Sequence, residues 1–186
     1  MPSRAKAAAA RERLRGKYRP IKVRMLFVGE SPPASGRFFY QADSGLYRAV
    51  RSAFITALPA LGDADFLKSF RTLGCYLVDL CGQPVDRLEA KKRRHACAEG
   101  EARLSWIIKR LEPEMIVTVV RSIVANVERA QRRADWSGVH LVLPYPGRWQ
   151  HHRVAFEKEL VPVLRRELRS RLNAEPGPNS RKALRP

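Results

Sequence analysis

The chain has 186 residues, of which 36 are Lys or Arg and 18 are Asp or Glu, so its formal net charge is +18. Hydrophobic residues make up 45% of it, which argues against wholesale disorder, and no apolar run approaches the roughly 20 residues of a membrane span. We therefore expect one compact, soluble, intracellular domain without disulfides, because the three cysteines include no close pair.

The basic residues are concentrated at the two ends of the chain. Residues 1–20 carry seven basic and one acidic side chain, and residues 165–186 carry seven and two, so these tails hold +11 of the net charge. The part between them remains basic at +7. This excess favours a polyanionic partner, because basic side chains displace counterions from nucleic acid. Simple solvation of the chain ends is the alternative explanation of the tail charges.

Composition divides the chain into three parts. Residues 1–20, rich in Ala and Arg, are expected to form a basic N-terminal arm with a frayed helix that Pro20 closes. Residues 21–171 are expected to form the folded domain, and residues 172–186 a disordered basic tail.

Short apolar runs that end at turn signals predict four strands, at residues 21–28, 75–80, 115–120 and 139–143. Apolar residues three and four apart predict helices at 46–58, 65–70, 96–111, 122–132 and 152–171, the last interrupted near Pro162. Strands that alternate with helices predict an α/β fold, with three α/β/α layers and a central four-stranded, mostly parallel sheet.

Functional groups of such a sheet gather in loops beyond the carboxyl ends of the strands. The first of these loops, Gly29 to Tyr40, presents Glu30 and Ser31 before two prolines and three aromatic residues. A carboxylate in a partly dry cleft can deprotonate a water, and an aromatic ring can stack on a flat base. The plainer interpretation is a solvated loop acid beside core aromatics. The chain has no Walker-type loop and no G-x-G-x-x-G fingerprint, which excludes the usual nucleotide-cofactor sites.

Four segments in order resemble the uracil-DNA glycosylase superfamily, over roughly residues 22–160. Gly29-Glu30-Ser31-Pro32 is similar to its first motif, and Gly36-Arg37-Phe38-Phe39 to a segment whose last Phe stacks on the flipped base. Residues 95–120 are similar to its iron-sulfur branch, and Leu143-Pro144-Tyr145-Pro146-Gly147-Arg148 lies where the family has its second motif. The resemblance implies a monofunctional DNA glycosylase that flips a deaminated or damaged base, uracil or a related one, and hydrolyses its N-glycosidic bond.

The resemblance and the charge pattern together imply roles for particular residues. The expected catalytic residues are Glu30, Ser31 and His151. The expected base-binding residues are Gly29, Phe38, Phe39, Asp79 and Tyr145. The expected DNA-binding residues are Arg37, Lys91, Lys92, Arg93, Arg94, Arg121, Arg148 and Trp149. The run from 91 to 94 is also explained by plain solvation, and a long side chain after residue 147 could fill the gap that an extruded base leaves.

Two departures from the family pattern keep a second function open. Leu143 stands where the best-known branch has a His that stabilises the departing base, and Asp79 stands where several branches have an Asn. A carboxylate can only accept hydrogen bonds, so it would favour a base edge with N–H donors. A target base other than uracil is therefore open. The missing His supports an alternative to a glycosylase, a non-catalytic protein that binds DNA or a damaged base, and a weaker third hypothesis is an enzyme acting on a free nucleoside or another small substrate.

Cofactors are not expected. Cys81 and Cys97 have a spacing similar to one pair of cluster ligands in the iron-sulfur branch, but the other pair is missing, so we predict no cluster, no metal site and buried apolar cysteines. The expected partner is DNA and not a membrane. We expect a monomer in the cytoplasm, associated with the nucleoid.

Overall fold

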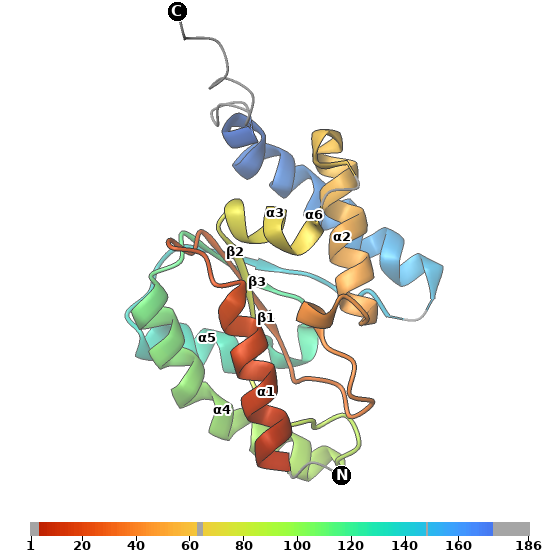
Figure 1. Cartoon of the computed structure of the whole chain (residues 1–186). Coiled ribbons are helices and arrows are strands. Elements are labelled where there is room, and N and C mark those ends of the chain that lie inside the picture. Colours follow the sequence, from red (N-terminus) through yellow and green to blue (C-terminus); the bar gives the residue numbers. More distant parts are fainter. Residues whose placement is uncertain (1–3, 63–64, 148, 173–186) are drawn as a thin grey trace, which may run out of the picture.

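The computed structural model describes residues 4–62, 65–147 and 149–172, with side chains from residue 5 to residue 168 within these ranges (Figure 1). Its centre is one sheet of four parallel strands in the order β2-β1-β3-β4. The strands are β1 (Met25–Gly29), β2 (Cys75–Asp79), β3 (Met115–Thr118) and β4 (Val139–Val142). The predicted α/β class is confirmed, and every pairing is parallel.

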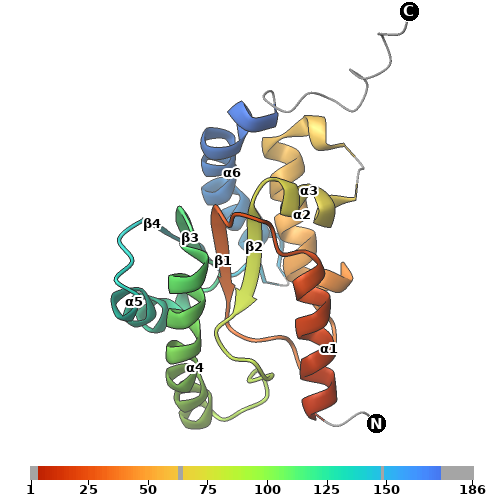
Figure 2. The same cartoon turned by 60° about the vertical axis from the view of Figure 1, so that its left-hand side comes forward.

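Helices cover both faces of this sheet, which gives the predicted three layers (Figures 1 and 2). One layer contains α2 (Gly45–Ala57), α3 (Phe66–Thr72) and α6 (Gln150–Leu172), and the other contains α4 (Ala90–Leu111) and α5 (Val124–Arg133). Short 3-10 turns, Phe39–Gln41, Pro59–Leu61 and Arg121–Ile123, join some of these elements. Strands β1, β2 and β3 are buried throughout, as expected for a sheet covered on both faces.

The direction of winding reverses next to β1. The chain passes from β1 to β2 on one side, and then crosses to β3 on the other side of β1. Gly29 pairs with Asp79 at the carboxyl end of the sheet, and Val28 pairs with Thr118. In sheets of this kind the crevice at such a reversal is where ligands bind, so this end of the sheet is the first place to look for a site.

The described part of the N-terminal segment, from residue 4 onward, packs on the domain, whereas a basic arm was expected at residues 1–20. Helix α1 (Arg4–Lys17) lies beside β2, which is an edge strand, and its Arg15 is buried against Asp79. The ring of Tyr18 stacks on Tyr40 at a centroid distance of 5.6 Å, and Leu14 packs on the core. The composition hid this contact because the most buried side chain of the helix is an arginine. The expected tail at 172–186 falls, beyond residue 172, outside the described residues.

Two helix boundaries differ from the prediction. Helix α4 begins at Ala90 instead of residue 96, so the basic run 91–94 lies on a helix and not in a loop. Apolar spacing could not reveal this first turn, because its side chains are charged and good helix formers. Helix α6 runs through Pro162 without interruption. Its neighbours Val161 and Leu164 are buried on the core, and this packing holds the two halves in line.

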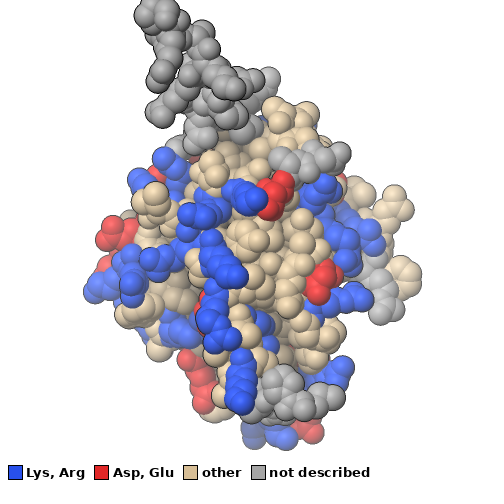
Figure 3. All heavy atoms as spheres, in the orientation of Figure 1, with Lys and Arg blue, Asp and Glu red and all other residues tan. Residues whose placement is uncertain are grey.

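The surface is rich in basic side chains, in agreement with the net charge of +18. Lys and Arg side chains form a band down the face shown in Figure 3, with few acidic groups beside them. None of the described helices is both long enough and apolar enough to cross a bilayer.

Candidate functional site

A cavity of about 390 Å³ lies beyond the carboxyl ends of β1, β2 and β3, where the winding reverses. Its walls come from the loop after β1, the end of β2, the residues after β3 and the start of α2. Nine of the residues predicted from the sequence line it: Gly29, Glu30, Ser31, Arg37, Phe38, Phe39, Asp79, Arg93 and Tyr145. Its volume is within the range of small-molecule sites, about 300 to 1,000 Å³.

Glu30 is held in place by an arginine from α4. Arg93 donates two hydrogen bonds to it, from Nε to Oε1 at 2.7 Å and from Nη2 to Oε2 at 2.5 Å. The bond to Glu30 raises the pKa of Arg93. Such a fork fixes the plane of a carboxylate and leaves its other lone pairs free to accept from a water or a ligand. Glu30 is therefore an oriented acceptor in the wall of the cavity.

Two thiols lie behind this carboxylate. The sulfur of Cys97 is 3.9 Å from Oε1 of Glu30 and 3.7 Å from the sulfur of Cys81. Both cysteines are buried and free, like Cys75, and burial raises the pKa of Cys81 to about 12. The Cys97 thiol donates a weak hydrogen bond to Glu30 and accepts one from Cys81, so these buried cysteines also make a polar contact with the site, beyond the apolar packing expected of them.

Asp79 is buried at the floor of the cavity and is already paired. Its Oδ2 accepts a hydrogen bond of 2.7 Å from Nη2 of Arg15, and its backbone oxygen accepts one from Arg103. Burial raises the pKa of the Asp79 carboxyl, and the two guanidinium groups oppose that rise. The other oxygen, Oδ1, faces Gly29: a Cβ on Gly29 would lie 3.0 Å from it. Glycine at this position therefore lets the carboxylate reach the cavity.

Aromatic side chains form the apolar wall. The ring of Phe39 is buried among Tyr40, Tyr47 and Phe70, with centroid distances of 5.1 to 5.8 Å. Phe38 is also buried, and the guanidinium of Arg15 lies over its ring at 5.3 Å. Both residues line the cavity and their rings are fixed by their neighbours, so this wall of the cavity is apolar and preformed.

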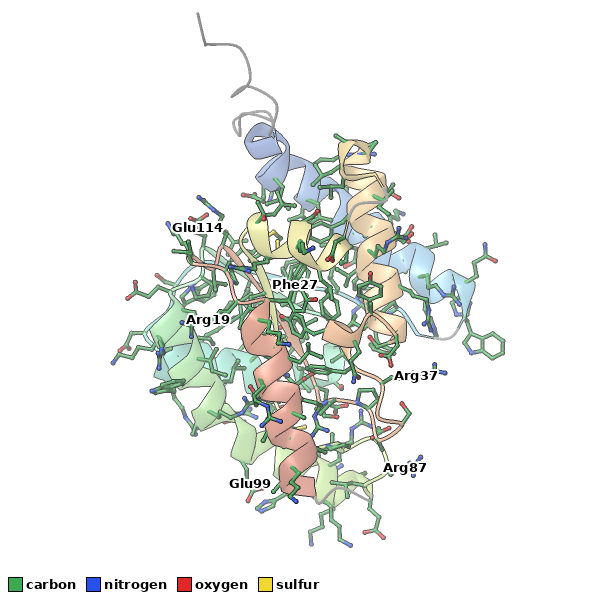
Figure 4. All side chains as sticks on the ribbon, in the orientation of Figure 1. Arg19, Phe27, Arg37, Arg87, Glu99 and Glu114 are labelled. Carbon is green, nitrogen blue, oxygen red and sulfur yellow. The ribbon has the colours of Figure 1, made fainter. Side chains whose placement is uncertain are left out.

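The mouth of the cavity is polar. Tyr145 and Arg37 are exposed there, and Figure 4 shows Arg37 and Arg87 pointing away from the domain on the side of these loops. The hydroxyl of Ser31 is already engaged within the protein, because its Oγ accepts a hydrogen bond from the backbone N–H of Val85.

Other predicted residues do not reach the cavity. His151 is exposed in the first turn of α6, 4.1 Å from the ring of His152, and does not line it. The expected catalytic role of His151 is therefore not supported by its position. Lys91, Lys92, Arg94, Arg121 and Trp149 are exposed and lie outside the lining, and Arg148 lies outside the described residues. Arg121 is 3.5 Å from Glu159 of α6.

Three residues of the site were not predicted from the sequence: Asp86, Ser44 and Arg15. Asp86 lines the cavity and accepts hydrogen bonds from the backbone N–H of Ala34 at 3.1 and 3.2 Å. Ser44, also in the lining, caps α2 by accepting from the N–H of Tyr47. The position of Asp86 in a loop after a strand was a usable signal, whereas nothing in the sequence around Arg15 points to the site.

Among the described residues, no group of three or more His, Cys, Asp or Glu side chains could hold a metal ion. Comparison with models of known protein families and with curated protein sequences gives no match to this chain. The functional assignment therefore depends on the chemistry of the cavity.

Proposed function

We propose that the chain is a DNA glycosylase that takes a deaminated or damaged base, uracil or a related one, into this cavity and hydrolyses its N-glycosidic bond. The observation that carries the proposal is that an oriented carboxylate, Glu30, a buried carboxylate, Asp79, and two aromatic residues, Phe38 and Phe39, line one cavity at the carboxyl end of the sheet. A base extruded from DNA needs these three features: a flat apolar wall, a polar group for its edge and a carboxylate near its sugar.

Bond cleavage would use Glu30. Cleavage of the bond from C1' to the base nitrogen leaves its electron pair on the base and positive charge on the sugar, which a nearby carboxylate stabilises. A water that donates to Glu30 then adds to C1', and its proton passes to the carboxylate and on to the departing base. The products are a free base and an abasic site in the DNA.

Recognition of the base would use Asp79. Its Oδ2 is occupied by Arg15, so Oδ1 is the atom available for an N–H donor on the base edge. Uracil and deaminated purines carry such a ring N–H. Arg37 and the exposed residues Lys91, Lys92 and Arg94 would contact DNA phosphates. In this proposal the protein is a monomer that acts on DNA in the cytoplasm, at the nucleoid.

One observation favours a second function. Leu143 stands where the best-known branch of the family that the chain resembles has a His. Its side chain is fully buried and offers no hydrogen-bond donor to a departing base. A non-catalytic protein, which binds the extruded base without cleaving it from its sugar, would need the cavity and the basic surface but not this donor.

A base panel separates the two. Oligonucleotides with uracil, hypoxanthine, xanthine or no modification, single- and double-stranded, are incubated with excess protein and then treated with alkali, which breaks the strand at abasic sites. The glycosylase proposal predicts breaks at one of the modified bases only. Retarded but unbroken DNA contradicts it and supports the binding function.

A further inference from the structure

A second cavity, of about 260 Å³, lies between α1, the edge strand β2 and α4. Four arginines and one acidic residue line it: Arg15, Arg19, Arg103, Arg110 and Glu12. It shares no lining residue with the cavity beyond β1, β2 and β3. We call it the arginine cleft. It lies on the face with the basic band in Figure 3, and Figure 4 shows Arg19 between α1 and α4.

The positive charge of the arginine cleft is only partly neutralised. Glu12 is bonded to Nη1 of Arg15, and Asp79 takes Nη2 of the same guanidinium. The Nε of Arg15 is buried and has no hydrogen-bond partner in the part of the chain that the structure describes. Burial and the nearby Arg15 lower the pKa of Arg103. Guanidinium groups forced together in this way favour an added anion, and Arg matches phosphate oxygens well.

An aromatic platform stands at the same cleft. Trp106 of α4 lines it and is 59% exposed, an unusual position for so large an apolar ring. The guanidinium of Arg110 lies 5.1 Å from the centre of this ring. An exposed indole backed by an arginine is a surface on which a nucleobase stacks.

We propose that the arginine cleft is a binding site for a nucleoside phosphate, with the phosphate on Arg19 and Arg103 at its surface and the base on Trp106. Phosphate alone would explain the arginines, but not the exposed indole beside them. A free nucleotide and a nucleotide within a DNA strand offer the same chemistry, so the test includes both. The site does not depend on base excision in the first cavity.

The test measures quenching of tryptophan fluorescence and binding heat with three probes: ADP, a short unmodified oligodeoxyadenylate and inorganic phosphate. The variants are Arg19→Glu and Trp106→Leu. Their controls are Arg132→Glu, at an exposed residue of α5, and Val154→Ala, at an exposed apolar residue of α6; both residues lie outside the cleft. Thermal melting checks that each variant is folded.

The proposal predicts that ADP, the oligonucleotide or both bind, that Arg19→Glu weakens this binding at least about tenfold, and that Trp106→Leu removes the quenching and weakens binding to a similar extent. The two controls should change affinity less than about twofold. Binding of ADP alone identifies a free nucleotide as the ligand, and binding of the oligonucleotide alone a DNA strand. The proposal is overturned if neither ADP nor the oligonucleotide binds, or if Arg19→Glu and Arg132→Glu have equal effects on affinity. It is also overturned if inorganic phosphate binds as tightly as ADP and the oligonucleotide while Trp106→Leu has no effect.

Discussion

Arg15 of α1 and Asp79 of β2 form a buried ion pair, with Nη2 of the arginine 2.7 Å from Oδ2 of the aspartate and side chains only 4% and 7% exposed. This pair connects the N-terminal helix to the floor of the candidate site. It also lies between the two cavities, because Asp79 lines the first and Arg15 lines the arginine cleft.

Removal of Arg15 should strongly destabilise the protein. Arg15→Ala leaves the Asp79 carboxylate buried without its partner, and breaking one side of a buried pair typically costs about 3 to 5 kcal/mol. Urea unfolding at neutral pH measures the loss. Arg13→Ala, on the exposed face of the same helix, is the control and should stay within about 0.5 kcal/mol of the parent. Equal stabilities of the two variants would show that residues 1–20 are the dispensable arm that the composition suggested.

Two helical glycines should respond oppositely to alanine. A Cβ at Gly100 of α4 would clash with the backbone oxygen of Leu80, so Gly100→Ala forces α4 away from the end of β2 and should cost about 1 to 3 kcal/mol. A Cβ at Gly16 of α1 meets nothing within 4 Å, so Gly16→Ala should stabilise the protein by up to about 1 kcal/mol. Thermal or urea unfolding of the two variants checks this. Stabilisation by Gly100→Ala would mean that α4 does not approach the sheet so closely.

Acid should weaken the contact between α4 and α5 through Glu101. Burial alone would raise the pKa of this carboxyl, but hydrogen bonds from Arg129 and Asn126 outweigh burial and lower it. The unfolded chain therefore takes up the proton more readily than the folded one. The stabilisation is complete above the ordinary glutamate pKa of about 4.3 and is lost as the pH falls through the lower folded value.

The measurement is urea unfolding of the parent and of Glu101→Gln at about pH 6 and about pH 3. The difference in the free energy of unfolding should be large at the higher pH and should shrink at the lower one. Glu128→Gln, an exposed control on α5, should show no such change. A difference in the free energy of unfolding that is the same at both pH values would contradict a stabilising role for the ionised Glu101 carboxylate.

The fold was largely predictable because its signals are local. Apolar runs such as residues 115–120 are buried on both faces of the sheet, so they are visible without knowledge of their neighbours. The loop at Glu30 was predictable for a related reason, since the carboxyl end of a parallel strand is where sites form. The start of α4 was missed, because its first turn is charged and contributes no apolar spacing.

Contacts between distant segments were not predictable. Arg15 lies 64 residues from Asp79, and Arg93 lies 63 residues from Glu30. No spacing rule joins such positions, so the sequence showed Arg15 as part of a basic arm and Arg93 as a phosphate contact. His151 was expected near the base because of its place after Gly147, but the first turn of α6 leaves it exposed.

The central claim is that Glu30 acts on the sugar of an extruded base. The most direct test is single-turnover excision of the best base from the panel by the parent, Glu30→Gln and Glu99→Gln, an exposed glutamate on α4 that serves as the control. Glu30→Gln keeps the size of the side chain and removes its charge, so it should slow cleavage at least about tenfold while Glu99→Gln leaves the rate unchanged. Cleavage by Glu30→Gln at the parent rate would contradict this role for Glu30.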